Sequence, residues 1–277
     1  MICSTICPAK INTFLAVDPP DHSGYHPIRS YFQAISLADH LSIQDSPTGK
    51  DQIICNWPDL PPNNTLTKTL RLARELVPIA PLKITLNKQI PSEAGLGGGS
   101  SNAAGLLRCL NFINSEFVSN QFAREIAFAV GADVPYFLTG GFAQAEGYGQ
   151  ILTPLPAQPK QFLLVVKPTE GMSTPTAYKN LDQAPRPFRD FPENYQTYYN
   201  DFERVAPCIC GEIAERLQVH GATSALMTGS GTAVFGIMPS QSAAERAKLI
   251  LEGENLGQVF IANTLTRDES LCTTLSS

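Results

Sequence analysis

The chain has 277 residues, of which 43% are hydrophobic and 16% charged, and its formal net charge is −5. This composition is typical of a folded globular protein of one or two domains and excludes a disordered chain. The negative balance argues against a general nucleic-acid binder, because no basic field would attract a phosphate backbone. Any phosphate that this protein binds must therefore be held locally.

The compartment is indicated by the cysteines and by the apolar segments. The seven cysteines follow no pattern of a disulfide framework or a zinc site, which favours free thiols in a reducing compartment. The N-terminal segment lacks the basic start of a signal peptide. The uncharged stretch 219–244 contains four glycines and a proline, which argues against a membrane span. We expect a cytoplasmic protein that needs no membrane.

In the first half of the chain, alternating apolar residues predict strands and 3.6-residue periods predict helices. The segment 5–17 predicts a strand that is broken near Pro8 and Lys10. A second strand begins at residue 28, after the turn "DHSGYHP". The further elements expected here are a strand over 51–57, a helix over 65–77, a strand over 82–90, helices over 102–114 and 120–130, and strands within 140–155. Ser100 or Ser101 is expected to cap the helix over 102–114, and Gly131 to end the next helix in a left-handed conformation.

The second half begins after the proline-rich segment 154–161, which predicts domains over 1–157 and 158–277. A buried strand over 162–166 is followed by a helix whose aromatic face covers the core. These aromatic residues are Phe191, Tyr195, Tyr198, Tyr199 and Phe202. The elements expected next are a helix over 210–221, two strands joined by a tight glycine hairpin within 222–238, and a helix over 242–253. Strands and helices mix without strict βαβ alternation, which favours an α+β fold.

The stretch "EAGLGGGSSN", residues 93–102, places four glycines directly before two serines. Ordering so many glycines is costly, so the stretch is either a flexible linker or a loop whose N–H groups surround an anion. A linker does not fit, because predicted structure adjoins it closely on both sides. The P-loop spelling is absent, and the dinucleotide fingerprint lacks both its third glycine and its βαβ context. A glycine loop that leads into a helix N-terminus still suits a phosphate group.

Several motifs together resemble the GHMP small-molecule kinases. "PSEAGLGGGSSNAAGLL" resembles the central signature of this family, and "PAKINTFLAV" and "MTGSGTAVFG" resemble its first and last motifs. "GADVPYF" and "GYH" are similar to the branch that phosphorylates the 2-hydroxyl of a cytidylated sugar alcohol in the non-mevalonate isoprenoid route. The resemblance implies a two-domain α+β fold, with a ribosomal-protein-like N-terminal domain, a ferredoxin-like C-terminal domain and an active site in the cleft between them. It also implies ATP as phosphate donor, Mg²⁺ held mainly by the nucleotide and no metal held by the protein alone.

The same resemblance implies roles for individual residues. Asp133 is implied as the base that takes the hydroxyl proton, and Lys10 as the cation beside it. Judged from the sequence alone, Asp133 could equally cap a short helix, and Lys10 could extend its head to water. Tyr25 is implied to stack on cytosine, His26 to recognise the edge of the base and Tyr178 to form the opposite wall. An ordinary hairpin turn is the alternative explanation for Tyr25 and His26.

The remaining expected contacts lie on both sides of the reacting phosphate. The other substrate contacts implied are Asn12, Thr228, Gly229 and Ser230. The nucleotide contacts implied are Pro91, Ala94, Gly95, Leu96, Gly97, Gly98, Gly99, Ser100, Ser101 and Asn102, with Asn64 near adenine. Two alternatives stay open, a sister kinase for homoserine or mevalonate and a non-catalytic nucleotide-binding protein. As partners we expect small molecules alone, without nucleic acid, and a monomer or weak homodimer.

Overall fold

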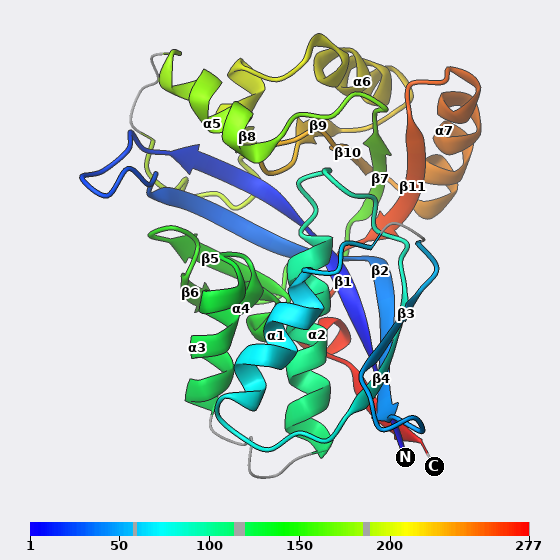
Figure 1. The fold of residues 1–277 in the computed structure, drawn as a ribbon. Coiled ribbons are helices and arrows are strands. Elements are labelled where there is room, and N and C mark those ends of the chain that lie inside the picture. Colours follow the sequence, from blue (N-terminus) through cyan, green and yellow to red (C-terminus); the bar gives the residue numbers. More distant parts are fainter. Residues whose placement is uncertain (58–59, 114–119, 185–188, 277) are drawn as a thin grey trace.

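The computed structural model describes residues 1–57, 60–113, 120–184 and 189–276, which form two lobes joined by two long strands (Figure 1). The first half contains β1 (Ile2–Val17), β2 (Ile28–Asp45), β3 (Gln52–Cys55), α1 (Thr65–Arg74), β4 (Leu82–Asn87), α2 (Gly98–Ile113), α3 (Asn120–Val130), α4 (Val134–Thr139), β5 (Phe142–Glu146) and β6 (Ile151–Pro154). The second half contains β7 (Phe162–Lys167), α5 (Thr174–Asp182), β8 (Tyr199–Asn200), the 3₁₀ helix η2 (Asp201–Arg204), α6 (Cys208–Val219), β9 (Ser224–Met227), β10 (Val234–Met238), α7 (Gln241–Gly253), β11 (Gln258–Asn263), α8 (Arg267–Ser270) and β12 (Thr273–Ser276).

Two sheets organise the described part of the chain. The larger has the order β12-β1-β2-β4-β3, with β5 attached to β2, β6 attached to β5 and β8 attached to β1. Helices α1 to α4 lie on one side of it (Figure 1). The smaller sheet is antiparallel, with the order β11-β7-β10-β9, and helices α6 and α7 pack against it. The arrangement confirms the predicted α+β class.

The N-terminal strand is continuous, so the predicted break near Pro8 and Lys10 is wrong. β1 pairs with β2 along almost its whole length, and the irregularity appears instead as two shifts of register. One shift lies between Pro8 and Ala9 and the other between Asn12 and Phe14. Such bulges bend a strand and redirect its side chains without ending the pairing. Lys10 and Asn12 lie between the two shifts.

Two expected helix ends are also corrected. α2 begins at Gly98, four residues before the predicted start, so Ser100 and Ser101 lie in its first turn and do not precede it. The Ser101 N–H already donates to Gly97 O at 2.9 Å. Gly131 follows α3 without adopting a positive φ angle, because the chain turns directly into α4. Residue 114, the last of the predicted helix, lies outside the described residues. None of the helices described is long and apolar enough to cross a bilayer.

The aromatic residues between 191 and 202 do not form the predicted helix. The chain is irregular there until the short strand β8 and the helix η2. Phe191, Tyr195 and Tyr199 nevertheless cover an apolar cluster that contains Phe14 and Tyr31, as the aromatic pattern predicted. Side-chain packing on this cluster, and not helical periodicity, therefore fixes the segment.

The C-terminal end returns to the larger sheet. β12 pairs antiparallel with β1, Ile2 opposite Ser276, so the two chain ends lie side by side (Figure 1). β8 pairs parallel with the other end of β1, at Phe14 and Leu15. Two late strands therefore belong to the first sheet, while the boundary at 157/158 stays a prediction.

A buried carboxylate connects β2, β4 and α2. Asp39 is fully buried, and its Oδ1 accepts from the N–H groups of Gln89 and Ile90 at 2.7 and 2.8 Å. Its Oδ2 accepts from Lys88 Nζ at 2.5 Å and from Asn102 Nδ2 at 2.8 Å. Lys88 also donates to Asn102 Oδ1 at 3.1 Å. One side chain thus fixes the segment that leads into the glycine loop and the first turn of α2.

Removing this carboxylate should strongly destabilise the fold. Asp39→Ala would leave the Lys88 ammonium buried without its anion, which costs about 3–5 kcal/mol of unfolding free energy. Urea denaturation measures this loss. Asp45→Ala, at the exposed end of the same strand, is the matched control and should change stability by less than about 0.5 kcal/mol. The double variant Asp39→Ala/Lys88→Met should recover part of the loss, and equal stability of Asp39→Ala and Asp45→Ala would contradict the assignment.

Candidate active site

A cleft of about 1810 Å³ opens between the glycine loop, the loop before β2, helix α5 and the loop after β9. It is lined by most of the residues that the sequence singled out. These are Lys10, Asn12, Tyr25, His26, Asn64, Pro91, Ala94, Gly95, Leu96, Gly97, Gly98, Gly99, Ser100, Asn102, Asp133, Tyr178, Gly229 and Ser230. Ser101 and Thr228 are fully buried and do not line the cleft. Residues from seven separate segments of the chain therefore meet in one place.

The glycine loop is fixed by main-chain contacts on both sides. The Lys10 N–H donates to Leu96 O at 3.0 Å, and the Ala233 N–H donates to Ala94 O at 3.2 Å. Gly95 has a φ of 72°, and a Cβ there would collide with Thr228 O. Gly97 has a φ of 74°, and a Cβ there would lie 2.8 Å from the Phe137 ring. Only glycine satisfies both the conformation and the space at these two positions.

The start of α2 presents main-chain donors to the cleft. The bond from Ser101 N–H to Gly97 O is the first of the helical pattern, so the N–H groups of Gly98, Gly99 and Ser100 precede it. These N–H groups lie at the positive end of the helix dipole, which suits an anion. Ser101 Oγ is buried and has no hydrogen-bond partner within the described part of the chain. The Asn102 side chain, in contrast, is occupied by Asp39 and Lys88.

Lys10 is buried and does not extend to solvent, which excludes the surface alternative for this side chain. Its exposed fraction is 4%, and its Nζ donates to Asn12 Oδ1 at 2.5 Å. Burial lowers the pKa of the Lys10 ammonium below its ordinary value, and the charge of Asp133 partly offsets this effect. Asn12 is held in turn by Thr228, whose Oγ1 accepts from the Asn12 N–H at 2.9 Å. Lys10 and Asn12 therefore project from the same side of β1.

Asp133 occupies the N-cap position of α4 without capping it. Its backbone is helical, and its side chain makes no hydrogen bond to the helix start. Pro135, in the first turn, lacks an N–H that would need such a partner. The carboxylate lines the cleft, and its charge acts on Lys10. The structure therefore gives Asp133 no capping role and leaves it available for chemistry.

The loop before β2 presents two rings to the cleft. Tyr25 is 67% exposed. His26 Nδ1 lies 2.9 Å from Asp18 O, and its Nε2 lies 3.5 Å from Asp182 Oδ2 of α5. The ring of Tyr178 lies against His26, with centroids 4.8 Å apart, and meets Phe202 edge-on at 4.9 Å. Tyr178 thus lines the same cleft, where its ring lies against His26.

The loop after β9 is longer than the predicted tight hairpin. Six residues, 228–233, separate β9 from β10, and Thr228 N–H donates to Ala233 O at 2.9 Å. Asn200 Nδ2 donates to Met227 O and Gly229 O at 2.8 and 2.9 Å. The loop packs against Gly95. The requirement for glycine in this loop therefore comes from the neighbouring glycine loop as well as from the turn between the two strands.

At the far end of the cleft, Asn64 has a structural task. Its Oδ1 accepts from the N–H groups of Leu66 and Thr67 in a capping box at the start of α1. Trp57 and Lys88 are among the cleft residues that sequence reasoning missed. Lys88 Nζ lies 5.3 Å from the Trp57 ring centroid. Neither stands in a recognisable motif, so only the alternation of the strand before Lys88 could have suggested that it points inward.

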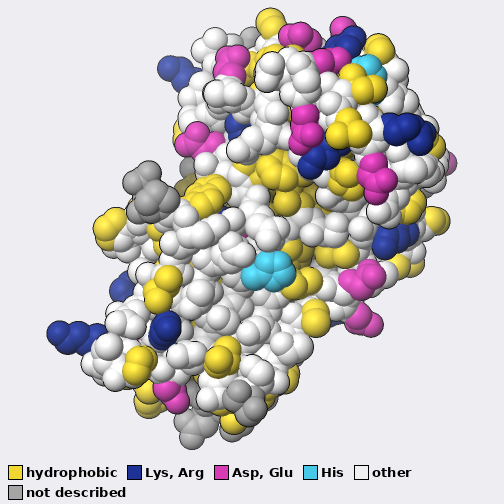
Figure 2. Space-filling view, turned by 90° about the vertical axis from the view of Figure 1, so that its right-hand side faces the viewer, with side chains coloured by type: hydrophobic (Ala, Val, Ile, Leu, Met, Phe, Trp, Pro, Cys, Tyr) yellow, Lys and Arg dark blue, Asp and Glu magenta, His cyan; other side chains and the backbone are white. Residues whose placement is uncertain are grey.

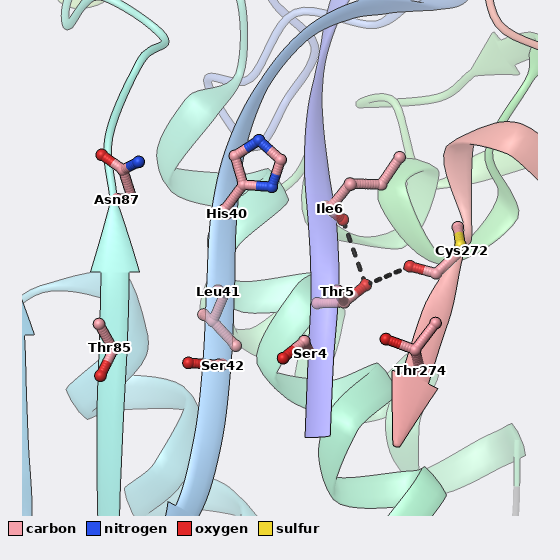
Figure 3. A pocket seen from close by; sticks show the side chains of 10 residues that line it. All are labelled: Ser4, Thr5, Ile6, His40, Leu41, Ser42, Thr85, Asn87, Cys272 and Thr274. Atoms are coloured by element: carbon pink, nitrogen blue, oxygen red, sulfur yellow. Dashed lines mark hydrogen bonds between the residues drawn. The ribbon is translucent and has the colours of Figure 1, made fainter. Parts of the chain in front are cut away.

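A smaller hollow of about 380 Å³ lies on the open face of the larger sheet (Figure 3). His40 and Asn87 stand opposite each other on β2 and β4, and Thr5 Oγ1 lies 2.9 Å from Cys272 O. None of the residues predicted to bind ligands lines this hollow.

The face seen in Figure 2 carries charges of both signs over the upper lobe and few charges below it. The large cleft is therefore the candidate active site.

Comparisons with known proteins agree with this geometry. Residues 64–141 match the model of the GHMP kinases N terminal domain, and residues 192–256 match that of the GHMP kinases C terminal domain. The homoserine kinase of Cytophaga hutchinsonii shares 17% identity with a TM-score of 0.69, covering 99% of this chain and 97% of that one. The mevalonate kinase of Methanococcus jannaschii shares 15% identity with a TM-score of 0.69, covering 96% and 98%. Likeness at this level concerns the fold alone, and the matches to an N-terminal and a C-terminal domain model confirm the predicted two-domain architecture.

Other relatives are much more similar. The 4-diphosphocytidyl-2-C-methyl-D-erythritol kinase of Geobacter metallireducens is 38% identical over 87% of this chain and 90% of its own. The protein of that name from Protochlamydia amoebophila is 36% identical over 86% and 85%. A crystal structure of 4-(cytidine 5'-diphospho)-2C-methyl-D-erythritol kinase is 30% identical with a TM-score of 0.80, covering 94% of this chain and 98% of that one. The chain belongs to the 4-diphosphocytidyl-2-C-methyl-D-erythritol kinase family of the GHMP kinases.

Proposed function

We propose that the chain transfers the γ-phosphoryl group of ATP to the 2-hydroxyl of 4-diphosphocytidyl-2-C-methyl-D-erythritol, giving the 2-phosphate and ADP. One observation carries the proposal. The buried Lys10 ammonium, under the influence of the Asp133 charge, lines the same cleft as the glycine loop and the loop of Tyr25 and His26. A kinase needs its base and its cation between the phosphate donor and the acceptor alcohol.

In this mechanism the N–H groups at the start of α2 bind the phosphate tail of ATP. Asp133 accepts the proton of the attacking hydroxyl, and Lys10 stabilises the negative charge that gathers around the transferred group. Asn12 holds the Lys10 ammonium in place, because its Oδ1 accepts from Nζ. Tyr25 stacks on cytosine, and His26 with the facing Tyr178 borders the base.

Mg²⁺ would neutralise charge on the phosphates while it is held mainly by the nucleotide. Among the described residues, no group of three His, Cys, Asp or Glu side chains could hold a metal ion. The Ser100 hydroxyl lies in the first turn of α2 and lines the cleft, where it would reach a water bound to the ion. The proposal places the reaction in the cytoplasm, in a monomer or weak homodimer, and requires neither nucleic acid nor a membrane.

The acceptor is tested by ADP release in the presence of ATP and Mg²⁺. The cytidylated substrate should support turnover, whereas homoserine and mevalonate should not, because neither gives the Tyr25 loop a base to bind. The same assay tests the non-catalytic alternative. Turnover with one of the other alcohols, or with none of the three, would refute the proposal.

Removing either reacting group should abolish most turnover without unfolding the protein. Lys10→Met and Asp133→Asn should each lower kcat by about 10²–10⁴-fold, measured at saturating concentrations of both substrates. Lys10→Met should not lower the free energy of unfolding, because it removes a buried charge. Lys50→Met, an exposed lysine in the turn after β2, is the control. A loss of less than tenfold in both cleft variants would remove the assignment.

The rate should also fall at high pH. Only the protonated Lys10 stabilises phosphate charge, and burial lowers its pKa, so kcat/KM should decline on the alkaline side before the ordinary lysine value of about 10.4 is reached. In Lys10→Arg this decline should shift upward, because guanidinium stays protonated. An unchanged alkaline limb in Lys10→Arg would show that another group titrates there.

The glycine loop should not tolerate a side chain at Gly95. Gly95→Ala would force the loop away from Thr228 O and misplace the donors of α2, so kcat/KM for ATP should fall by about 10²-fold. Gly211→Ala makes the same substitution in α6, where a Cβ would meet nothing within 4 Å. This control should keep full activity and gain stability, since alanine favours a helix. Equal kinetics for the two variants would exclude the loop from nucleotide binding.

A further inference from the structure

The turn between β5 and β6 supports the loop that carries Tyr25. The Ile28 N–H donates to Gly147 O at 2.6 Å, which joins the two loops at the base. Gly147 and Gly149 have φ angles of 64° and 101°, so the turn is sharp. Tyr148, between these glycines, lines the large cleft.

The ring of Tyr148 packs on Tyr25. Their centroids lie 5.6 Å apart with the planes tilted by 53°. Tyr25 is otherwise open to solvent, with 67% of its surface exposed. Within the described part of the chain, Tyr148 is the aromatic ring that Tyr25 contacts. A ring that projects so far from the core would sample several rotamers without this contact.

The hydroxyl of Tyr148 holds the same loop through a second path. It donates to Asp21 Oδ2 at 2.5 Å. Asp21 Oδ1 accepts from the N–H of Ser23 at 2.8 Å, and the main chain of Asp21 bonds to Tyr25 O at 2.9 Å and to the Gly24 N–H at 2.9 Å. The bonds from Ser23 and Tyr148 lower the pKa of Asp21 to about 2, so the carboxylate remains an acceptor at neutral pH. Tyr148 therefore fixes both the side chain of Tyr25 and the turn beneath it.

We propose that Tyr148 is a positioning residue for recognition of the nucleobase: its ring and its hydroxyl hold Tyr25 in the orientation that receives cytosine. This inference rests on the proposed function. The role is distinct from catalysis, because Tyr148 acts through Tyr25 and not on the reacting atoms. Fixing the ring before binding lowers the entropic cost of ordering this loop when the substrate binds.

The test is a double-variant cycle that compares Tyr148→Phe, Tyr148→Ala, Tyr25→Ala and Tyr25→Ala/Tyr148→Ala. Tyr148→Ala should raise KM for the cytidylated substrate by about three- to tenfold, the range of one aromatic contact. Tyr148→Phe, which keeps the ring, should raise it less. In both variants kcat and KM for ATP should stay within twofold of wild type. In the Tyr25→Ala background the second substitution should add less than twofold, because the residue that it positions is already gone.

Tyr198→Phe is the matched control, since its hydroxyl is bonded to Gln161 outside the cleft. Titration of each variant with cytidine 5'-diphosphate by calorimetry gives an independent readout and should show the same order of affinities. Three results would overturn the inference: an unchanged KM for the cytidylated substrate in both Tyr148 variants, an equally large rise in KM for ATP, or fully additive effects in the double variant. If Tyr148→Ala unfolds, Tyr148→Phe and the binding titration still decide. A wild-type protein that binds the cytidine nucleotide but releases no ADP would instead refute the proposed function and leave the Tyr148 comparison intact.

Discussion

The buried carboxylate of Asp39 is the interaction on which the geometry of the cleft depends. It accepts four hydrogen bonds, two from main-chain N–H groups after β4 and two from the side chains of Lys88 and Asn102. A buried anion needs this many donors, because water is not available to replace them. The glycine loop begins on one side of this network and α2 on the other. A loop with so little intrinsic order is thereby held at both ends.

A second buried charge lies across the glycine loop and has the opposite sign. Lys10 is kept in the core by an amide oxygen and by the more distant charge of Asp133. Such an environment is unfavourable for a lysine if stability alone is considered, and the lowered pKa expresses that cost. Asp39 and Lys10 therefore represent two different uses of burial, one that fixes the frame and one that prepares a charge for chemistry. The proposed kinase mechanism needs both, since phosphoryl transfer depends on position and electrostatics.

The cleft is built by segments that the chain brings together from both lobes. The glycine loop bonds to β1 through Lys10 and to the loop after β9 through Ala233. Asn200, just before η2, fixes that second loop from behind. On the opposite rim, the β5–β6 turn supports the loop of Tyr25. The two sides of the site, for phosphate and for nucleobase, thus rest on separate supports, so each can be perturbed alone.

The sequence by itself determined the α+β class, most strands and helices and the family, because alternation, periodicity and local motifs are encoded over short spans. Nearly all of the site residues that it singled out line the cleft, together with many that it did not. Only the tertiary structure decided how β1 continues through Pro8, where α2 begins and what holds the 191–202 segment, because partners distant in the chain override local preference there. Tyr148 and Lys88 could not be found in the sequence for the same reason. Each obtains its role from a neighbour more than 40 residues away, Asp21 for Tyr148 and Asp39 for Lys88. No local pattern records such a pairing.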